Sequence, residues 1–449
     1  MSVNSQADLN HRPGASESIR RMMTVVFVFL AIIYSHSRAQ DTTGIPDEPI
    51  IYAVEIIGNR VTSDKLILRE MKLKPGMTAT PKALEKDRLN IESLGLFNRV
   101  VVELAEDEGR AVVQVTVTEP FYIYPFLTGR YDVNRPERAV LGVGIYHCNF
   151  NGLGRRFKAS VWSGYARGFY IDHDDAWFSI GGGYGLDGRI YYNDDVVKDP
   201  YDKEVRRRSS GIGLTVKRRL GRRHSLGFNL GWEVISSSSD YYTLTPGGRD
   251  RVLSLAIIYA DDKRDYRYYP TSGYYITLNA EASRLVDFNR YFYREMAEVR
   301  GYVPFDPLIL ALRGWGEFGQ HTLPYYRWLA VGRDLVRAGD GFSNPKGMVL
   351  GGSLELRFRL VKPFYLSFDK VPVAGPYLRG LKFSLEGVVF GDRGFYASHR
   401  SGFRNDFRAW GFGVQAQLPY IKTAHLLVGW TPDLELNRPS ITVKNGVTF

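Results

Sequence analysis

The sequence predicts a mainly β protein, in which an antiparallel, membrane-spanning β-barrel of about 16 strands follows one small α+β domain. Three observations support this prediction. From Phe121 onward, short segments alternate between apolar and polar side chains and are separated by turn residues. The 449 residues include 46 Gly, 29 Tyr and 25 Phe at a mean hydropathy of −0.23, which is typical of strands and turns. An apolar run near the N-terminus has the features of an export signal.

Residues 1–39 are predicted to be a signal peptide. Arg20 and Arg21 precede the apolar run MTVVFVFLAIIY, and the small-residue segment SRA follows it, so cleavage would leave Gln40 as the first mature residue. The run has 12 residues, whereas a spanning helix needs about 20. A signal anchor and a buried helix are the alternatives. Residues 40–49 then form a polar linker.

Residues 50–119 are predicted to form the small α+β domain. The expected elements are a strand over 51–57, helices over about 63–71 and 81–94, and strands over 100–104 and 111–117. Pro81 suits the first turn of the second helix, where a missing N–H costs nothing. The order β-α-α-β-β resembles a POTRA (polypeptide-transport-associated) domain, and the matching segments are VEIIGNRVTSDKLI, LGLFNRVVVEL and VVQVTVTEP. Another small α+β domain is the alternative.

Residues 120–449 are predicted to form the barrel. Segments such as AVLGVGIYHC, AWFSIGGGYG, VLSLAIIYA and GGSLELRFRL carry apolar side chains on one face and polar or small ones on the other. A soluble sandwich shows the same alternation. A membrane barrel is favoured because the sequence offers no helices to cover a sheet face and because aromatic residues recur near strand ends. A closed barrel also satisfies every backbone group in lipid, which an open sheet cannot do.

Several short motifs occur in a fixed order along this region. They are NFNGLGRRFKASV with Asn149, Gly152 and Gly154, DDKRDYRYYPTSGYYITL with Asp262, Arg264, Pro270 and Gly273, LVRAGDGF followed by GGSLELRF, VVFGDRGFY with Gly391 and Gly394, and the final NGVTF. Together they resemble the outer-membrane barrel-assembly superfamily, which includes BamA, TamA and the bacterial surface-antigen barrels. The resemblance implies one POTRA domain in the periplasm of a Gram-negative bacterium and a barrel of about 16 strands in its outer membrane.

The resemblance also implies an ion pair inside the barrel. In relatives, a long extracellular loop folds back into the lumen, and its arginine pairs with acidic residues of the inner wall. Carried over to this sequence, the arginine is Arg337 and the wall carboxylates are Glu355 and Asp392. Glu355 and Arg357 would then face the lumen, and the residues that alternate with them, Leu354, Leu356 and Phe358, would face lipid. Ala338 stands where the family has glycine, and a solvated surface arginine is the alternative.

The last residue, Phe449, ends an alternating strand. A terminal Phe in this position resembles the signal that the barrel-insertion machinery reads. An ordinary final strand that stops at Phe is the alternative.

The resemblance implies a non-enzymatic protein that assembles, inserts or translocates other proteins at the outer membrane, as BamA and TamA do. Its partners would be the outer-membrane lipid bilayer, unfolded outer-membrane or secreted polypeptides bound through the POTRA domain, and periplasmic proteins or lipoproteins. A secretion pore or channel for a dedicated partner or solute is the alternative. A barrel enzyme such as a lipase is a third hypothesis, although no GxSxG motif is present.

Composition and motifs argue against other classes. The net charge of +11 comes from basic residues spread along the chain, without a motif that reads nucleic acid. Cys148 is the single cysteine, which excludes an internal disulfide and a CxxC metal site. GYGLDG lies among strands rather than before a helix, so no dinucleotide or other cofactor is expected. YIDHDDAW and NDDVVKDPYDKEVRRR are predicted to be solvent-exposed loops, with a divalent-cation site in YIDHDDAW as the alternative.

Overall fold

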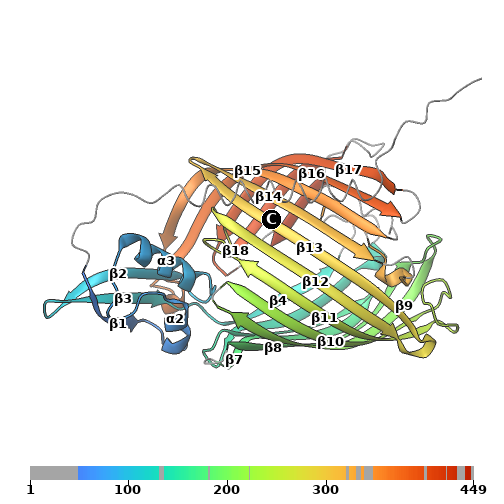
Figure 1. Cartoon of the computed structure of the whole chain (residues 1–449), viewed down its shortest axis with the longest axis horizontal. Helices are drawn as coiled ribbons and strands as arrows, with labels where there is room; N and C mark the ends of the chain where they lie inside the picture. The colour runs from blue at the N-terminus through green and yellow to red at the C-terminus, as the bar shows by residue number, and fades with distance from the viewer. Residues whose placement is uncertain are drawn as a thin grey trace, which may run out of the picture. The chain divides into compact units, whose positions relative to one another are not determined.

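The structure is a computed structural model of the chain (Figure 1). It describes residues 49–130, 136–179, 183–221, 223–319, 323–329, 335–337, 347–398, 402–420, 422–431 and 440–445. All of them belong to one compact unit, Pro46–Phe449. The predicted signal peptide and nearly all of the predicted linker lie outside the described residues.

The N-terminal domain has the predicted order of elements. β1 (Ile51–Ile57) is followed by helices α2 (Asp64–Glu70) and α3 (Pro81–Glu92) and by strands β2 (Arg99–Asp107) and β3 (Arg110–Thr118). The strands form one sheet in the order β1-β3-β2, in which β1 is parallel to β3 and β2 is antiparallel to it. The predicted elements are therefore confirmed, with ends displaced by a few residues.

Helix α3 starts where the sequence favours helix initiation. The side chain of Thr80 accepts a hydrogen bond from the Ala83 N–H at 3.0 Å, and Pro81 occupies the first turn. The helices pack on the sheet around a buried core that includes Leu66, Ile67, Ile91, Leu96, Val113 and Val115. Burial of each such side chain contributes about 1.5–3 kcal/mol. Among the helices that the structure describes, none is both long and apolar enough to cross a membrane.

The second region is one 16-stranded sheet. Its strands are β4 (Ile123–Arg130), β5 (Val140–Phe150), β6 (Arg155–Gly164), β7 (Arg167–Ser179), β8 (Tyr184–Lys198), β9 (Glu204–Leu220), β10 (His224–Ser237), β11 (Arg249–Asp262), β12 (Gly273–Leu285), β13 (Arg290–Phe305), β14 (Leu308–Gly319), β15 (Met348–Leu366), β16 (Leu381–Ser398), β17 (Gly402–Leu418), β18 (Lys422–Trp430) and β19 (Ser440–Asn445). Each strand pairs with its neighbours in the sequence, and every pair is antiparallel. The predicted fold class is confirmed.

The sheet rolls up into a barrel (Figure 1). Tyr124 of the first barrel strand, β4, contacts Tyr420 in the turn between β17 and β18, with ring centroids 5.7 Å apart. A contact between the two ends of the strand order requires the sheet to curve back on itself.

The outer face of the barrel is apolar. In the middle of β9, β10 and β11 the exposed side chains include Ile212, Leu214 and Val216, Phe228, Leu230 and Trp232, and Leu253, Leu255 and Ile257. Cross-strand pairing places Leu230 between Leu214 and Leu255, so these residues form one continuous apolar surface. The alternate residues of β11, such as Val252 and Ser254, are buried. A soluble sandwich would bury its apolar face, so this orientation is that of a membrane barrel.

Three predictions are wrong in detail. AWFSIGGGYG, predicted as one strand, contains the end of β7 and the start of β8. YIDHDDAW, predicted as a loop, lies within β7. NDDVVKDPYDKEVRRR, also predicted as a loop, contains the last residues of β8 and the first residues of β9. These charged segments remain strands because partners across the sheet offset their charge: Arg189 donates to Asp172 at 3.3 Å, and Arg207 donates to Asp195 at 2.6 Å.

Candidate functional site

Strands β15 and β16 place charged side chains on the inner face of the barrel. Glu355 lies opposite Phe390, and Ser353 lies opposite Asp392. Because side chains alternate along a strand, Ser353 and Glu355 share a face and Leu354 points to the other. Leu354 is 50% exposed, whereas Glu355 is 1% exposed. The predicted assignment of alternate residues to the outer and inner faces is confirmed for this strand.

Arg337, from the connection between β14 and β15, binds both predicted carboxylates. Its Nε and Nη2 donate to the two oxygens of Asp392 at 3.0 and 2.8 Å, and its backbone N–H donates to the same carboxylate at 2.7 Å. Its Nη1 donates to Glu355 Oε2 at 2.5 Å. A guanidinium group has the forked donors that this arrangement needs, and a lysine does not. The structure therefore brings Arg337, Glu355 and Asp392 together.

A fourth charged residue, Arg357, lies beside these three. The sequence predicted that it faces inward but did not mark it as a site residue. Its Nε donates to Glu355 Oε1 at 2.6 Å, and its Nη1 donates to the carbonyl of Pro270 at 3.4 Å. We call Arg337, Glu355, Arg357 and Asp392 the lumen network; each is 5% exposed or less. Its two cations and two anions sum to zero formal charge, which offsets part of the cost of burying them.

The lumen network reaches the connection between β11 and β12, residues 263–272, through the carbonyl of Pro270. Within this connection, Arg264 donates to both oxygens of Asp262 at 2.8 and 2.7 Å. Gly273 has a φ of 95°, and a Cβ there would lie 2.2 Å from a backbone oxygen of the same connection. The motif that contains these four residues therefore fixes the conformation of the connection.

The same connection contacts the N-terminal domain. The Arg267 N–H donates to Ser93 Oγ at 3.3 Å. Gly95 lies so close to Tyr268 that a Cβ would be 2.5 Å from the phenolic oxygen. A continuous series of contacts thus runs from the β14–β15 connection, through the lumen network and Pro270, to the N-terminal domain.

The β14–β15 connection also binds a second part of the inner wall. Within its described segment 323–329, Arg327 donates to Glu233 of β10 at 2.6 Å, and Tyr326 donates to Asp250 of β11 at 2.9 Å. The outer-face residues of β10 and β11 alternate with Glu233 and Asp250, so both carboxylates face inward. Because the other members of the lumen network lie on β15 and β16, the described parts of this connection contact two separate regions of the inner wall.

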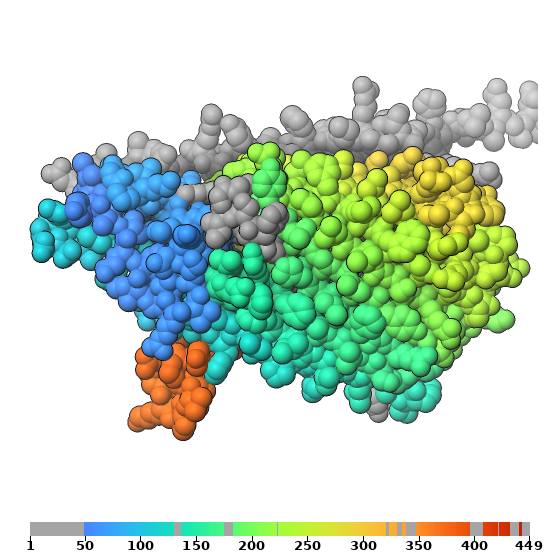
Figure 2. Space-filling view, turned by 90° about the horizontal axis from the view of Figure 1, so that it is seen from below, coloured from blue at the N-terminus to red at the C-terminus, as the bar shows by residue number. Residues whose placement is uncertain are grey.

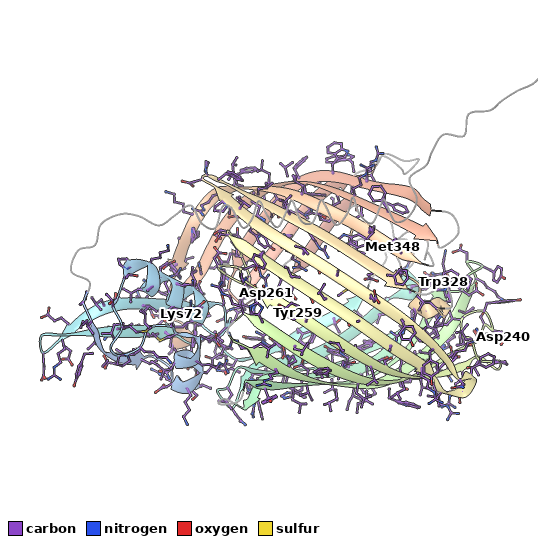
Figure 3. All side chains as sticks on the ribbon, in the orientation of Figure 1. Lys72, Asp240, Tyr259, Asp261, Trp328 and Met348 are labelled. Carbon is purple, nitrogen blue, oxygen red and sulfur yellow. The ribbon has the colours of Figure 1, made fainter. Side chains whose placement is uncertain are left out.

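Apolar contacts hold the same connection in place. Leu329 and Val336 are 2% and 0% exposed and pack in one cluster with Trp315 and Phe407. Figure 3 shows Trp328 toward the end of the barrel that lies away from the N-terminal domain. The connection therefore enters the lumen from that end.

The motif residues Asn149, Gly152 and Gly154 lie at the turn between β5 and β6, which is attached to the N-terminal domain. The buried side chain of Asn149 donates to Thr62 Oγ1 at 2.9 Å and accepts from the Gly154 N–H at 2.8 Å. The Ser63 N–H donates to the Gly152 carbonyl at 3.0 Å. Gly152 has a φ of 69°, and a Cβ there would lie 2.0 Å from a backbone oxygen of the N-terminal domain. We call this contact the joint.

Glu119 completes the joint at the end of the N-terminal domain. Its carboxylate accepts from the backbone N–H groups of Arg60, Val61 and Thr62 at 3.0, 3.0 and 2.7 Å. Burial alone would raise the pKa of Glu119, but the hydrogen bonds from these residues outweigh burial and hold the pKa below its ordinary value. The Tyr122 and Thr62 hydroxyls also form a hydrogen bond at 2.9 Å. An ionised carboxylate thus anchors this turn of the N-terminal domain.

Two ion pairs attach the helices of the N-terminal domain to the barrel. Arg219 of β9 donates to both oxygens of Glu70 at 2.9 and 3.0 Å. Burial opposes ionisation of Glu70, but the hydrogen bonds and charges of Arg219 and Arg69 together outweigh burial and lower the pKa of Glu70. Lys382 of β16 donates to Glu92 at 2.7 Å. Local sequence patterns do not reveal these pairs, because each joins residues more than a hundred positions apart.

The remaining predicted residues lie elsewhere. Gly391 lies opposite Leu354 on the outer side of the strand pair, and Gly394 lies opposite Gly351 and has no side chain, so neither joins the lumen network. Phe449 lies outside the described residues. In the described ranges, no group of three or more His, Cys, Asp or Glu side chains could hold a metal ion, and Cys148 is a free, buried thiol.

Comparison with known proteins agrees with this architecture. The Omp85 superfamily domain matches residues 149–361, and the POTRA family, described as a surface antigen variable number repeat, matches residues 49–119. Among solved structures, BamA from Haemophilus ducreyi lacking POTRA domains 1–3 is 15% identical, with a TM-score of 0.51 over 89% of this chain and 84% of that chain. CdiB from Escherichia coli is 13% identical, with a TM-score of 0.53 over 88% of this chain and 75% of that chain. At these identities the likeness is one of fold.

The fold and the lumen network define an antiparallel β-barrel protein that carries a small α+β domain at one end and folds one of its own connections into the lumen. The chain carries one POTRA domain over residues 49–119, followed by an Omp85 superfamily domain over residues 149–361. Barrels of this family reside in the outer membrane with their POTRA domains in the periplasm.

Proposed function

We propose that this chain is an outer-membrane protein that helps to insert unfolded polypeptides into the membrane, with its POTRA domain in the periplasm. The observation that carries the proposal is the combination of a POTRA domain with an Omp85 barrel whose own β14–β15 connection contacts two separate regions of the inner wall. Strand pairing and apolar burial would supply the driving force, so the activity requires no covalent chemistry.

The POTRA sheet offers an edge for an unfolded substrate. β1 and β2 are its edge strands, and in the described part of the chain neither pairs with a strand beyond β3. The start of β1 is covered, because Ile51 exchanges backbone hydrogen bonds with Gly76 and Met77. β2 has nine residues and is the more accessible edge. An extended polypeptide added there would bind mainly through its backbone, which suits substrates of varied sequence.

The lumen network favours insertion at the barrel wall over a permanently open pore. A polypeptide or solute that crosses the lumen would have to displace the β14–β15 connection. That displacement would separate Arg337 from two buried carboxylates, which is costly unless another cation replaces it.

Reconstitution tests the proposal. The mature chain is placed in vesicles of phosphatidylethanolamine and phosphatidylglycerol, and a urea-unfolded small barrel protein is added. Insertion is measured as the fraction of substrate that gains heat-modifiable mobility in a gel. We expect several-fold faster insertion than with vesicles that carry an equal amount of a barrel protein without a POTRA domain. Unchanged insertion rates, together with stable conductance in planar bilayers, would instead assign the chain to secretion pores or channels.

A further inference from the structure

The connection between β15 and β16 forms an exposed projection at the POTRA end of the barrel. β15 has 19 residues, although a tilted strand needs only about 10 to cross the hydrocarbon core. Its last part continues past the lumen network into the connection, residues 367–380. We call residues 360–379 the lobe. Figure 2 shows this segment, in orange, projecting beside the blue POTRA domain.

The lobe exposes large apolar side chains. Phe364, Leu366, Phe368, Val371, Val373 and Tyr377 are each more than a third exposed, and Val373 is 89% exposed. Soluble surfaces rarely gather so many large apolar residues in one segment. Val373 also has a φ of 62°, a conformation that β-branched residues rarely adopt. The chain therefore presents an apolar side chain at the tip of the lobe at a conformational cost.

The lobe has a defined internal structure. The Phe368 N–H donates to the Leu378 carbonyl at 3.0 Å, and the Gly380 N–H donates to Ser367 Oγ at 3.0 Å. Gly375 packs against backbone so closely that a Cβ would lie 2.4 Å from a carbonyl oxygen. The exposed apolar side chains are thus held on an ordered scaffold.

The β11–β12 connection provides a contrast at the same end of the barrel. It is also long and aromatic, but Tyr266 and Tyr269 are 7% and 8% exposed. Where the lobe meets the POTRA domain, Asn98 donates to the Tyr377 carbonyl at 2.8 Å, yet the Tyr377 side chain is still 38% exposed. One aromatic connection is therefore covered within the described chain, and the surface of the other is left for an external partner.

Two observations identify lipid as that partner. The outer-face residues of β15, Leu354 and Phe358, continue directly into Leu360 at the start of the lobe, and all three are exposed. The lobe is thus continuous with the apolar surface of the barrel. It also carries exposed Lys362 and Lys370, while its single acidic residue pairs with an arginine of the lobe. Aromatic and aliphatic side chains interspersed with lysine are typical of segments at the headgroup boundary of an anionic membrane.

We propose that the lobe rests in the headgroup region of the periplasmic leaflet, with Phe368 and Val373 among the lipid chains and Lys362 and Lys370 at the phosphates of anionic phospholipids. The inference rests on the proposed function in one respect, because it requires the barrel to lie in a bilayer. The lobe would set how deep this end of the β15–β16 hairpin lies in the bilayer. It would also hold the adjacent POTRA domain near the membrane surface.

A fluorescence measurement on the mature chain tests this inference. Val373→Cys is labelled with the environment-sensitive dye NBD, and because native Cys148 is 5% exposed, labelled wild-type protein gives the background. The protein is reconstituted in phosphatidylethanolamine and phosphatidylglycerol vesicles, with or without lipids that carry a nitroxide near the headgroup. Glu108→Cys, in a POTRA turn with a φ of 49°, is the aqueous control. Leu255→Cys, 58% exposed on the outer face of β11, is the lipid control.

We expect nitroxide lipids to lower the emission at position 373 by about two-fold, and iodide in the buffer to quench it about three-fold less than at position 108. Equal iodide quenching at positions 373 and 108, with no effect of nitroxide lipids, would overturn the inference. Protection of position 373 by an added unfolded polypeptide, but not by lipid, would also overturn it and would make the lobe a polypeptide-binding surface. If iodide quenches position 255 as strongly as position 108, the membrane barrel of the proposed function fails instead.

Discussion

The joint and the lumen network each attach one segment of chain to another, but they use different chemistry. At the joint, a carboxylate accepts from three consecutive backbone N–H groups, and Gly152 lies against backbone with no room for a Cβ. In the lumen network, which is buried, Glu355 accepts from two guanidinium groups and Asp392 accepts from one of them.

This difference determines which substitutions each region can tolerate. The joint depends on shape, because backbone groups cannot move aside to make space for a larger residue. The lumen network depends on charge balance, because every ion in it is buried and needs its partner. The joint is therefore suited to a fixed attachment of the POTRA domain. The network is suited to a contact that can be released if a competing charged group replaces one partner.

The largest effect is expected from Arg337→Ala. The substitution leaves Asp392 and Glu355 buried with half of their countercharge removed, which costs about 3–5 kcal/mol. We expect the temperature at which the barrel loses its heat-modifiable gel mobility to fall, together with the amount of folded protein in the outer membrane. Arg327→Ala is the matched control, because Arg327 belongs to the same connection but its ion pair with Glu233 is more exposed. An unchanged transition in Arg337→Ala would contradict the assigned role of the network.

The lumen network also shows how far sequence reasoning extends. Side chains along a strand point to its two faces in turn, so the sequence predicted that Glu355 and Arg357 lie on the inner face of β15. It did not reveal that Arg357 reaches Pro270, because that contact joins residues 87 positions apart. The same limit applies to Asn149, which was recognised from its motif, whereas its bond to Thr62 also spans 87 positions. Local patterns fix the face of a strand, but contacts between distant segments depend on the closure of the whole barrel.

Gly152→Ala is expected to have the second largest effect and to separate the two regions. The added methyl group would lie 2.0 Å from a backbone oxygen, and alanine would have to adopt a φ of 69°. Together these effects cost about 2–3 kcal/mol. We expect faster protease cleavage between the POTRA domain and the barrel, with the heat transition of the barrel unchanged. Gly188→Ala is the control, because no heavy atom beyond its own chain neighbours lies within 4 Å of its Cβ position. Wild-type protease resistance in Gly152→Ala would show that the joint is not limited by shape.

The smallest effect concerns Glu119 and pH, and it tests whether the joint has any charge dependence. The pKa of Glu119 in the folded protein lies below its ordinary value of 4.5, so folding favours the ionised carboxylate. Its contribution to stability is fully present above the ordinary pKa and is lost as the pH falls through the lower, folded-state pKa.

Glu119→Gln keeps one acceptor oxygen but no charge. We expect it to reduce the protection of the Val61 and Thr62 amides against hydrogen exchange by about ten-fold at pH 7. In wild-type protein the same protection should fall only in acid, and in Glu119→Gln this acid-dependent loss should disappear. Asp107→Asn, at the exposed end of β2, should leave the protection of both amides unchanged. If Glu119→Gln retains full protection at pH 7, the joint is held by shape alone and the contrast with the lumen network is complete.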